Sequence, residues 1–173
     1  WSVKALATDQ RQFHLQAQTE GFSIDLTVES RKPPVIHGIT GVSRKGQHPE
    51  HTSHYYSLTR LETAGSMVVE GARMAVTGLS WMDHEFGSAD LAEELVGWDW
   101  FSLQLDNDHD IMAYGLRRAD GTFDPASSGT LVSPNGSSTS LSFEEIRVRV
   151  QHHWTSPVSG ARYPSQWTFS IPS

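Results

Sequence analysis

The segment Trp81–Ser88 holds the side chains best suited to acid–base chemistry, because three titratable groups follow one another between aromatic residues. Asp83, His84 and Glu85 are consecutive, so at a strand end at least one of them points to each face of the sheet. Burial beside aromatic rings raises the pKa of a carboxyl group, which a general acid at neutral pH requires. The competing interpretation is a solvated surface turn, or one that His84 anchors by hydrogen bonds.

A second candidate acid lies in an aromatic run further along the chain. Asp99 lies between Trp98 and Trp100, so strand alternation places the two indole rings on one face and the carboxylate on the other. Indole faces stabilise cations, and an aromatic wall near an acid is suited to the protonation of an alkene. The alternative interpretation is that these large rings only pack in the core.

Composition argues against several other kinds of chemistry. The 173 residues include no cysteine, which removes disulfides, thiol catalysis and zinc–thiolate sites. His48, His51 and His54 recur every three residues, but a loop that contains proline cannot hold them as helical ligands, so we predict no metal and no cofactor. The net charge of −7 argues against a nucleic-acid partner, because counterion release needs clustered cations. No apolar run approaches the ~20 residues of a membrane helix.

The elements that must position these residues are strands, because apolar and polar residues alternate with a period of two and helical spacing is nearly missing. Residues 13–28 predict a hairpin that turns at Glu20-Gly21, and separate strands are expected at 55–62 and 67–70. One short helical turn is expected at 88–95. Further tight turns are predicted at Ala64-Gly65, Asp106-Asn107-Asp108, Asp120-Gly121 and Pro134-Asn135-Gly136. The fold class is therefore all-β, an antiparallel barrel or sandwich.

Residues 30–54 interrupt this pattern. Pro33 and Pro34 stop a strand because proline cannot donate to a strand ladder, and three glycines and four histidines follow. We interpret the segment as a linker or a functional crossover, and as the best internal boundary of the chain.

Several segments together resemble the carotenoid 1,2-hydratase (hydroxyneurosporene synthase) and AttH-like family. They are residues 32–38, 41–46, 55–61, 81–88 and 97–105, followed by matches between Trp154 and Trp167. The resemblance implies two lipocalin-like β-domains in tandem, of which about half is present. On this basis residues 1–30 are the last strands of a first domain, 31–54 the crossover, and 55–173 most of a second domain that lacks its terminal strands.

Enzymatic members of that family add water across a terminal isoprenoid double bond, which would make the chain a hydro-lyase. The resemblance thus implies Asp83 as proton donor, with His84 and Glu85 orienting it, and Asp99 as the competing acid. The cavity wall would be formed by Tyr56, Trp81, Trp98 and Trp100.

Two other functions stay open at this point. The same barrel could hold an apolar ligand, such as an isoprenoid, a lipid or a polyketide, without catalysis, or it could steer a polyene as a cyclase or pericyclase. Open strand edges would be covered by missing segments of the same polypeptide or by another chain. The resemblance also implies a periplasmic or secreted location in the bacterial envelope, with membrane association as an open alternative.

Overall fold

The chain folds almost entirely into antiparallel strands, as the period-two alternation predicts. The computed structural model describes residues 1–6, 8–9, 11–46, 50–87 and 92–171. The strands are β1 (Ser2–Ala5), β2 (Gln12–Thr19), β3 (Phe22–Ser30), β4 (Val35–Ile36), β5 (Val42–Arg44), β6 (Thr52–Val69), β7 (Ala72–Phe86), β8 (Leu95–Gln104), β9 (Asp110–Arg118), β10 (Ser128–Val132), β11 (Ser138–Ser142), β12 (Arg147–Thr155) and β13 (Arg162–Ser170), with one 3-10 turn at Phe143–Glu145. The all-β class is confirmed.

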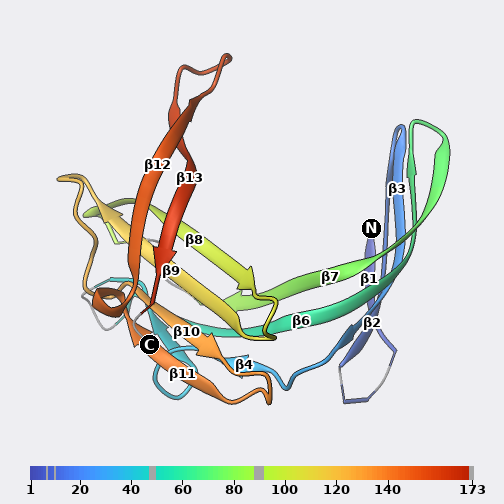
Figure 1. Cartoon of the computed structure of the whole chain (residues 1–173), viewed down its shortest axis with the longest axis horizontal. Coiled ribbons are helices and arrows are strands. Elements are labelled where there is room, and N and C mark those ends of the chain that lie inside the picture. Colours follow the sequence, from blue (N-terminus) through green and yellow to red (C-terminus); the bar gives the residue numbers. More distant parts are fainter. Residues whose placement is uncertain (7, 10, 47–49, 88–91, 172–173) are drawn as a thin grey trace.

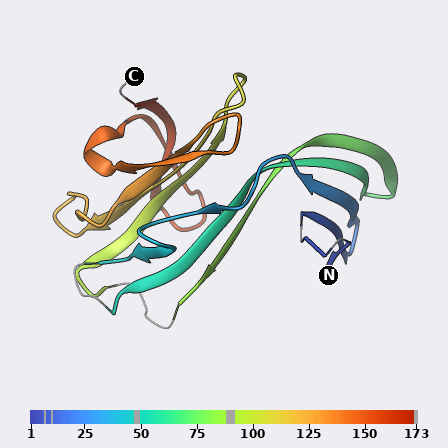
Figure 2. The ribbon, with the colours of Figure 1, turned by 90° about the horizontal axis from the view of Figure 1, so that it is seen from below.

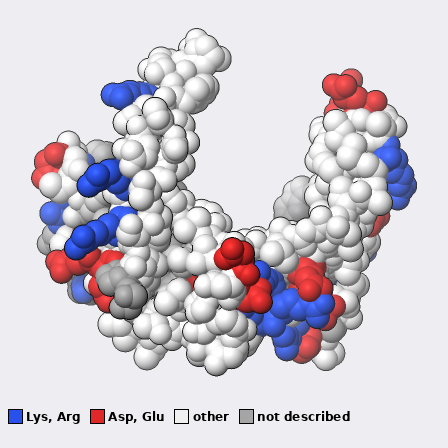
Figure 3. Space-filling view, viewed as in Figure 1, with Lys and Arg blue, Asp and Glu red and all other residues white. Residues whose placement is uncertain are grey.

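One long hairpin, β6 with β7, forms the floor of the molecule (Figure 1). On the edge of β6 that does not pair with β7, β3 pairs with the second half of β6, and β2 and β1 extend the sheet beyond β3. On that same edge β4 and β5 pair with the first half of β6. The four-stranded sheet β11-β10-β9-β8 and the hairpin β12–β13 lie at the other end of the molecule from β1–β3 (Figures 1 and 2). The result is a U-shaped chain whose two arms enclose a hollow with largely uncharged walls (Figure 3).

The expected turn at Ala64-Gly65 is wrong, because these residues lie inside the continuous strand β6. The chain instead reverses at Glu70 and Gly71, whose φ angles are 49° and 83°. Gly65 serves a close approach between strands, since a Cβ atom there would lie 2.1 Å from the carbonyl oxygen of Asp25. The predicted turns at 20–21, 106–108, 120–121 and 134–136 are confirmed by the hairpins that they close.

A buried ion cluster fixes the middle of β6. The pairing with β7 shifts register between Leu58 and Leu61, which leaves Thr59 and Arg60 in a bulge. Both side chains reach the fully buried Asp110 at the start of β9, with Thr59 Oγ1 donating at 2.8 Å and Arg60 Nε at 3.0 Å. Lys32, from the proline-containing segment, adds its ammonium group at 2.7 Å. The cluster therefore ties the crossover segment, β6 and β9 together.

Apolar packing joins the base of the hairpin to the second sheet. Tyr55 of β6 and Trp81 of β7 pack against Leu95, Met112 and Leu116 of β8 and β9. On the opposite face of that sheet, Phe101 and Leu141 pack with residues of β12 and β13. Asp83 lies at the first of these two layers, because Tyr55 and Trp81 both donate hydrogen bonds to it.

The predicted segment boundaries map onto this fold in a specific way. The expected start of a domain at residue 55 falls inside β6, which runs on from Thr52 to Val69. Within residues 1–30, β1 pairs with β2, β2 pairs with β3, and β3 pairs with the second half of β6, while residues 31–54 carry the short strands β4 and β5. The tandem arrangement of two domains stays a prediction. Residues 88–91 of the expected helical turn lie outside the described residues. In the part of the chain that is described, no helix is long and apolar enough to cross a membrane.

Candidate active site

The register of β6 and β7 decides which polar side chains meet. Ser57 lies directly opposite Asp83 and Tyr55 opposite Glu85, so these four side chains share one face. Tyr56 lies opposite His84, and that pair points to the other face. The face with Asp83 is the one that packs toward β8 and β9.

Three donors converge on a single oxygen of Asp83. Trp81 Nε1 donates to Oδ1 at 2.9 Å, the Tyr55 hydroxyl donates at 3.0 Å, and the Ser57 hydroxyl donates as well. Trp100 Nε1 donates in turn to the Tyr55 hydroxyl oxygen at 3.1 Å. Among the described residues none donates to Oδ2, so this oxygen is the one available to a ligand.

Tyr55 is held as a neutral donor. Burial of the ring is the main cause that raises the pKa of its hydroxyl above the ordinary value, and the neighbouring charge of Asp83 acts in the same direction. A phenol that keeps its proton at neutral pH can donate a hydrogen bond to the carboxylate throughout a reaction cycle.

A buried histidine lies behind Ser57. His37 is 1% exposed, and its Nε2 lies 2.7 Å from Ser57 Oγ while its Nδ1 lies 2.9 Å from Thr130 Oγ1. Its ring also contacts the ring of Tyr55, with centroids 4.4 Å apart. Burial lowers the pKa of His37 to about 4, so the imidazole is neutral at neutral pH.

A partly enclosed pocket of about 280 Å³ lies beside this cluster. Its aromatic lining includes Tyr55, Trp98, Trp100 and Tyr114. Lys45 also lines it and pairs with Glu85 at 2.6 Å, with its ammonium group 4.4 Å from the centroid of the Tyr114 ring. The pocket is therefore mainly aromatic, with one ion pair at its wall.

The structure brings only some of the predicted site residues together. Trp81 and Trp100 lie at Asp83, and their rings meet edge to face at 6.4 Å. Trp98 lines the pocket, while Glu85 shares the face of Asp83 but is bound to Lys45 and to the hydroxyl of Ser53.

The other predicted residues lie apart from Asp83. His84 and Tyr56 stack on each other on the opposite face, with centroids 5.1 Å apart, so His84 does not reach the carboxylate that it is expected to orient. Asp99 also points away from the pocket and lies 3.6 Å from Arg117. His48 is outside the described residues. Among those described, no three His, Asp or Glu side chains are grouped so that they could hold a metal ion.

Sequence reasoning missed Tyr55, Ser57 and His37. Period-two alternation separates Tyr55 and Ser57 from Tyr56, but it does not say which set faces Asp83. His37 lies in one of the segments that carry the family resemblance, which is the one signal in the sequence that points to it.

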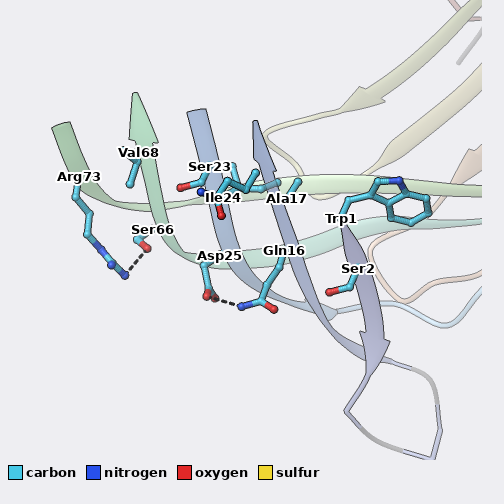
Figure 4. Close-up of a pocket in the computed structure, with 11 residues that line it drawn as sticks. Trp1, Ser2, Gln16, Ala17, Ser23, Ile24, Asp25, Ser66, Val68 and Arg73 are labelled. Carbon is cyan, nitrogen blue, oxygen red and sulfur yellow. Dashed lines mark hydrogen bonds between the residues drawn. The ribbon is translucent and has the colours of Figure 1, made fainter. Parts of the chain in front are cut away.

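A second pocket, of about 460 Å³, lies on the arm formed by β1–β3 and the tip of the long hairpin (Figure 4). Polar side chains that line it pair with one another, since Gln16 donates to the carboxylate of Asp25 and Arg73 donates to Ser66 (Figure 4). His14, which does not line the pocket, binds the other oxygen of the Asp25 carboxylate. These hydrogen bonds, first from His14 and then from Gln16, lower the pKa of Asp25 below its ordinary value. Both carboxylate oxygens of Asp25 are occupied by these side chains, whereas Asp83 keeps one oxygen without a donor among the described residues, so the pocket beside Asp83 is the better candidate.

The fold and this site define an all-β protein whose antiparallel sheets surround an aromatic pocket with a carboxylate at its side. The family profile described as AttH-like matches residues 1–173, and the chain belongs to the AttH-like family. No sequence among curated proteins matches it.

Two crystal structures share the fold. An AttH protein from Nitrosomonas europaea is 27% identical with a TM-score of 0.88, over 95% of this chain and 51% of that one. Kievitone hydratase from Nectria haematococca is 19% identical with a TM-score of 0.75, over 98% of this chain and 52% of that one. The chain thus spans about half the length of each of these structures.

Proposed function

We propose that the chain supplies the acid of a hydratase, which adds water to a carbon–carbon double bond of an apolar, isoprenoid-like small molecule. The observation that carries the proposal is the convergence of Tyr55, Ser57 and Trp81 on Asp83 Oδ1, because it leaves Oδ2 without a donor among the described residues. The shared fold with kievitone hydratase supports the same reaction class.

The proposed reaction keeps its protons in balance through Asp83. Protonated Oδ2 transfers its proton to the less substituted carbon of the double bond, and the π electrons form the new C–H bond, which leaves a positive charge on the more substituted carbon. The indole faces of Trp81 and Trp100 stabilise that cation. Water then forms a bond to the cationic carbon and returns one proton to the Asp83 carboxylate, so the product is a tertiary alcohol.

A non-catalytic carrier is the second candidate, and the exposure of Asp83 favours it. Asp83 belongs to β7 and is exposed, whereas an acid tuned by desolvation is expected to be enclosed. In this case the aromatic pocket would hold a lipid or a similar apolar molecule, and Asp83 would have no chemical role.

Incubation of the full-length protein with an acyclic carotenoid in H₂¹⁸O separates these functions. We expect a tertiary alcohol that carries ¹⁸O, a loss of this product in Asp83→Asn, and little change in Asp99→Asn, whose carboxylate lies on the other face beside Arg117. Undiminished hydration by Asp83→Asn would sink the assignment of the acid. A bound carotenoid that is recovered unchanged from the wild-type protein would instead support the carrier.

A further inference from the structure

The chain of hydrogen bonds behind Asp83 reaches far into the core. It runs from Thr130 of β10 through His37 to Ser57 of β6, and from there to Asp83 of β7. Thr130, His37 and Ser57 are all at most 3% exposed, so no bulk water competes for these groups. The chain therefore links two sheets to one carboxylate oxygen.

The direction of each hydrogen bond in this chain follows from the one proton on Ser57. The Ser57 hydroxyl has Asp83 Oδ1 on one side and His37 Nε2 on the other, and it can donate to only one of them. If Nε2 were unprotonated, two acceptors would compete for that proton and one buried acceptor would lose its partner. A proton on Nε2 removes the conflict, because His37 then donates to Ser57 and Ser57 donates to Asp83.

The far side of the imidazole supports the same tautomer. A neutral ring with its proton on Nε2 has a bare Nδ1, which needs a donor. The Thr130 hydroxyl lies 2.9 Å from Nδ1 and can donate to it. All three hydrogen bonds then point toward the carboxylate, and the low pKa of His37 keeps the ring in this neutral state at neutral pH.

We infer that His37 is a positioning residue, which as the neutral Nε2–H tautomer holds the Ser57 hydroxyl on Asp83 Oδ1 and so fixes the orientation of the Asp83 carboxylate. The catalytic consequence of this inference rests on the proposed hydratase function. The tautomer itself is a property of the resting protein and does not depend on any reaction.

Nitrogen-15 NMR of the imidazole rings tests the tautomer without a substrate. In the wild-type protein at pH 7 we expect His37 to show a protonated Nε2 and an unprotonated Nδ1. Thr130→Val removes the donor to Nδ1 and should weaken this preference, while Asp99→Asn serves as a control that leaves it unchanged. A protonated Nδ1 in the wild-type protein would overturn the inference whether or not the protein proves to be a hydratase.

Activity variants then test positioning against a merely structural role. His37→Leu should lower kcat about tenfold or more at nearly constant KM, since misplacement of a reacting group by 1 Å can cost as much as 100-fold. His37→Gln, whose amide can donate to Ser57 and accept from Thr130, should recover most of kcat. In a Ser57→Ala background the substitution His37→Leu should lower kcat little further, because the hydrogen bonds that connect His37 to Asp83 through Ser57 are already lost. An equal loss of kcat on His37→Leu in the presence and absence of Ser57 would contradict the inference. Circular dichroism identifies variants that fail to fold.

Discussion

The ion cluster at Asp110 allows a quantitative test of what holds the crossover segment, β6 and β9 together. Asp110 is fully buried, Lys32 is 3% exposed and Arg60 is 8% exposed, so the substitution Asp110→Asn removes the buried carboxylate that both cations share. Arg60 then keeps an ion pair only with the exposed carboxylate of Asp108, at 3.2 Å. Removal of one partner of a buried pair typically costs about 3–5 kcal/mol. Both cations keep other acceptors, since Lys32 also binds the carbonyl of Asp108 and Arg60 binds that of Leu105. We therefore expect a loss near the lower end, about 3 kcal/mol.

Urea denaturation followed by tryptophan fluorescence measures this change as a shift of the midpoint at a constant slope. The control is Glu62→Gln, because Glu62 pairs with Arg31 and both side chains are about half exposed. Exposed pairs of this kind contribute less than about 1 kcal/mol. If Asp110→Asn cost no more than Glu62→Gln, the reasoning that the buried cluster clamps the crossover segment onto β6 and β9 would be refuted.

Two further predictions concern the strands and the buried imidazole. Gly65→Ala should destabilise the protein by about 1–3 kcal/mol in the same urea assay, because its Cβ atom would meet the Asp25 carbonyl oxygen at 2.1 Å. The control is Gly78→Ala on the paired strand β7, which has open space around it and should change the free energy of unfolding by less than about 0.5 kcal/mol. The pKa of His37 falls from 6.5 to about 4 on folding, so the unfolded chain binds more protons than the folded protein between these pH values. The free energy of unfolding should therefore fall by up to about 3 kcal/mol as the pH drops from 7 to 4. His37→Gln should show a shallower decline over that range in thermal melts, and an identical decline in both proteins would contradict the origin of the effect.

Alternation in the sequence was sufficient for the fold class, and it also predicted that Trp98 and Trp100 share a face that Asp99 does not. It could not predict that Tyr55, rather than Tyr56, faces Asp83. That choice depends on the register between β6 and β7, and a slip of one residue exchanges the two faces of a strand. The turn predicted at Gly65 is wrong for a related reason, because a glycine needed for close approach between strands has the same sequence signature as one in a turn.

The bulge at Thr59 and Arg60 is the point where stability and the candidate site are coupled. Leu58 pairs with Met82 before the bulge and Leu61 pairs with Ser80 after it, so β6 uses one residue more than regular pairing with β7 would require. That extra residue lets both Thr59 and Arg60 reach Asp110, while Ser57, two residues earlier, stays in register with Asp83. Regular pairing through this region would direct Thr59 and Arg60 to opposite faces and leave one hydrogen bond of the buried cluster unmade. The buried charges therefore favour the irregular pairing that β6 adopts beside the acid, and the register that brings Ser57 to Asp83 depends partly on an ion cluster outside the pocket.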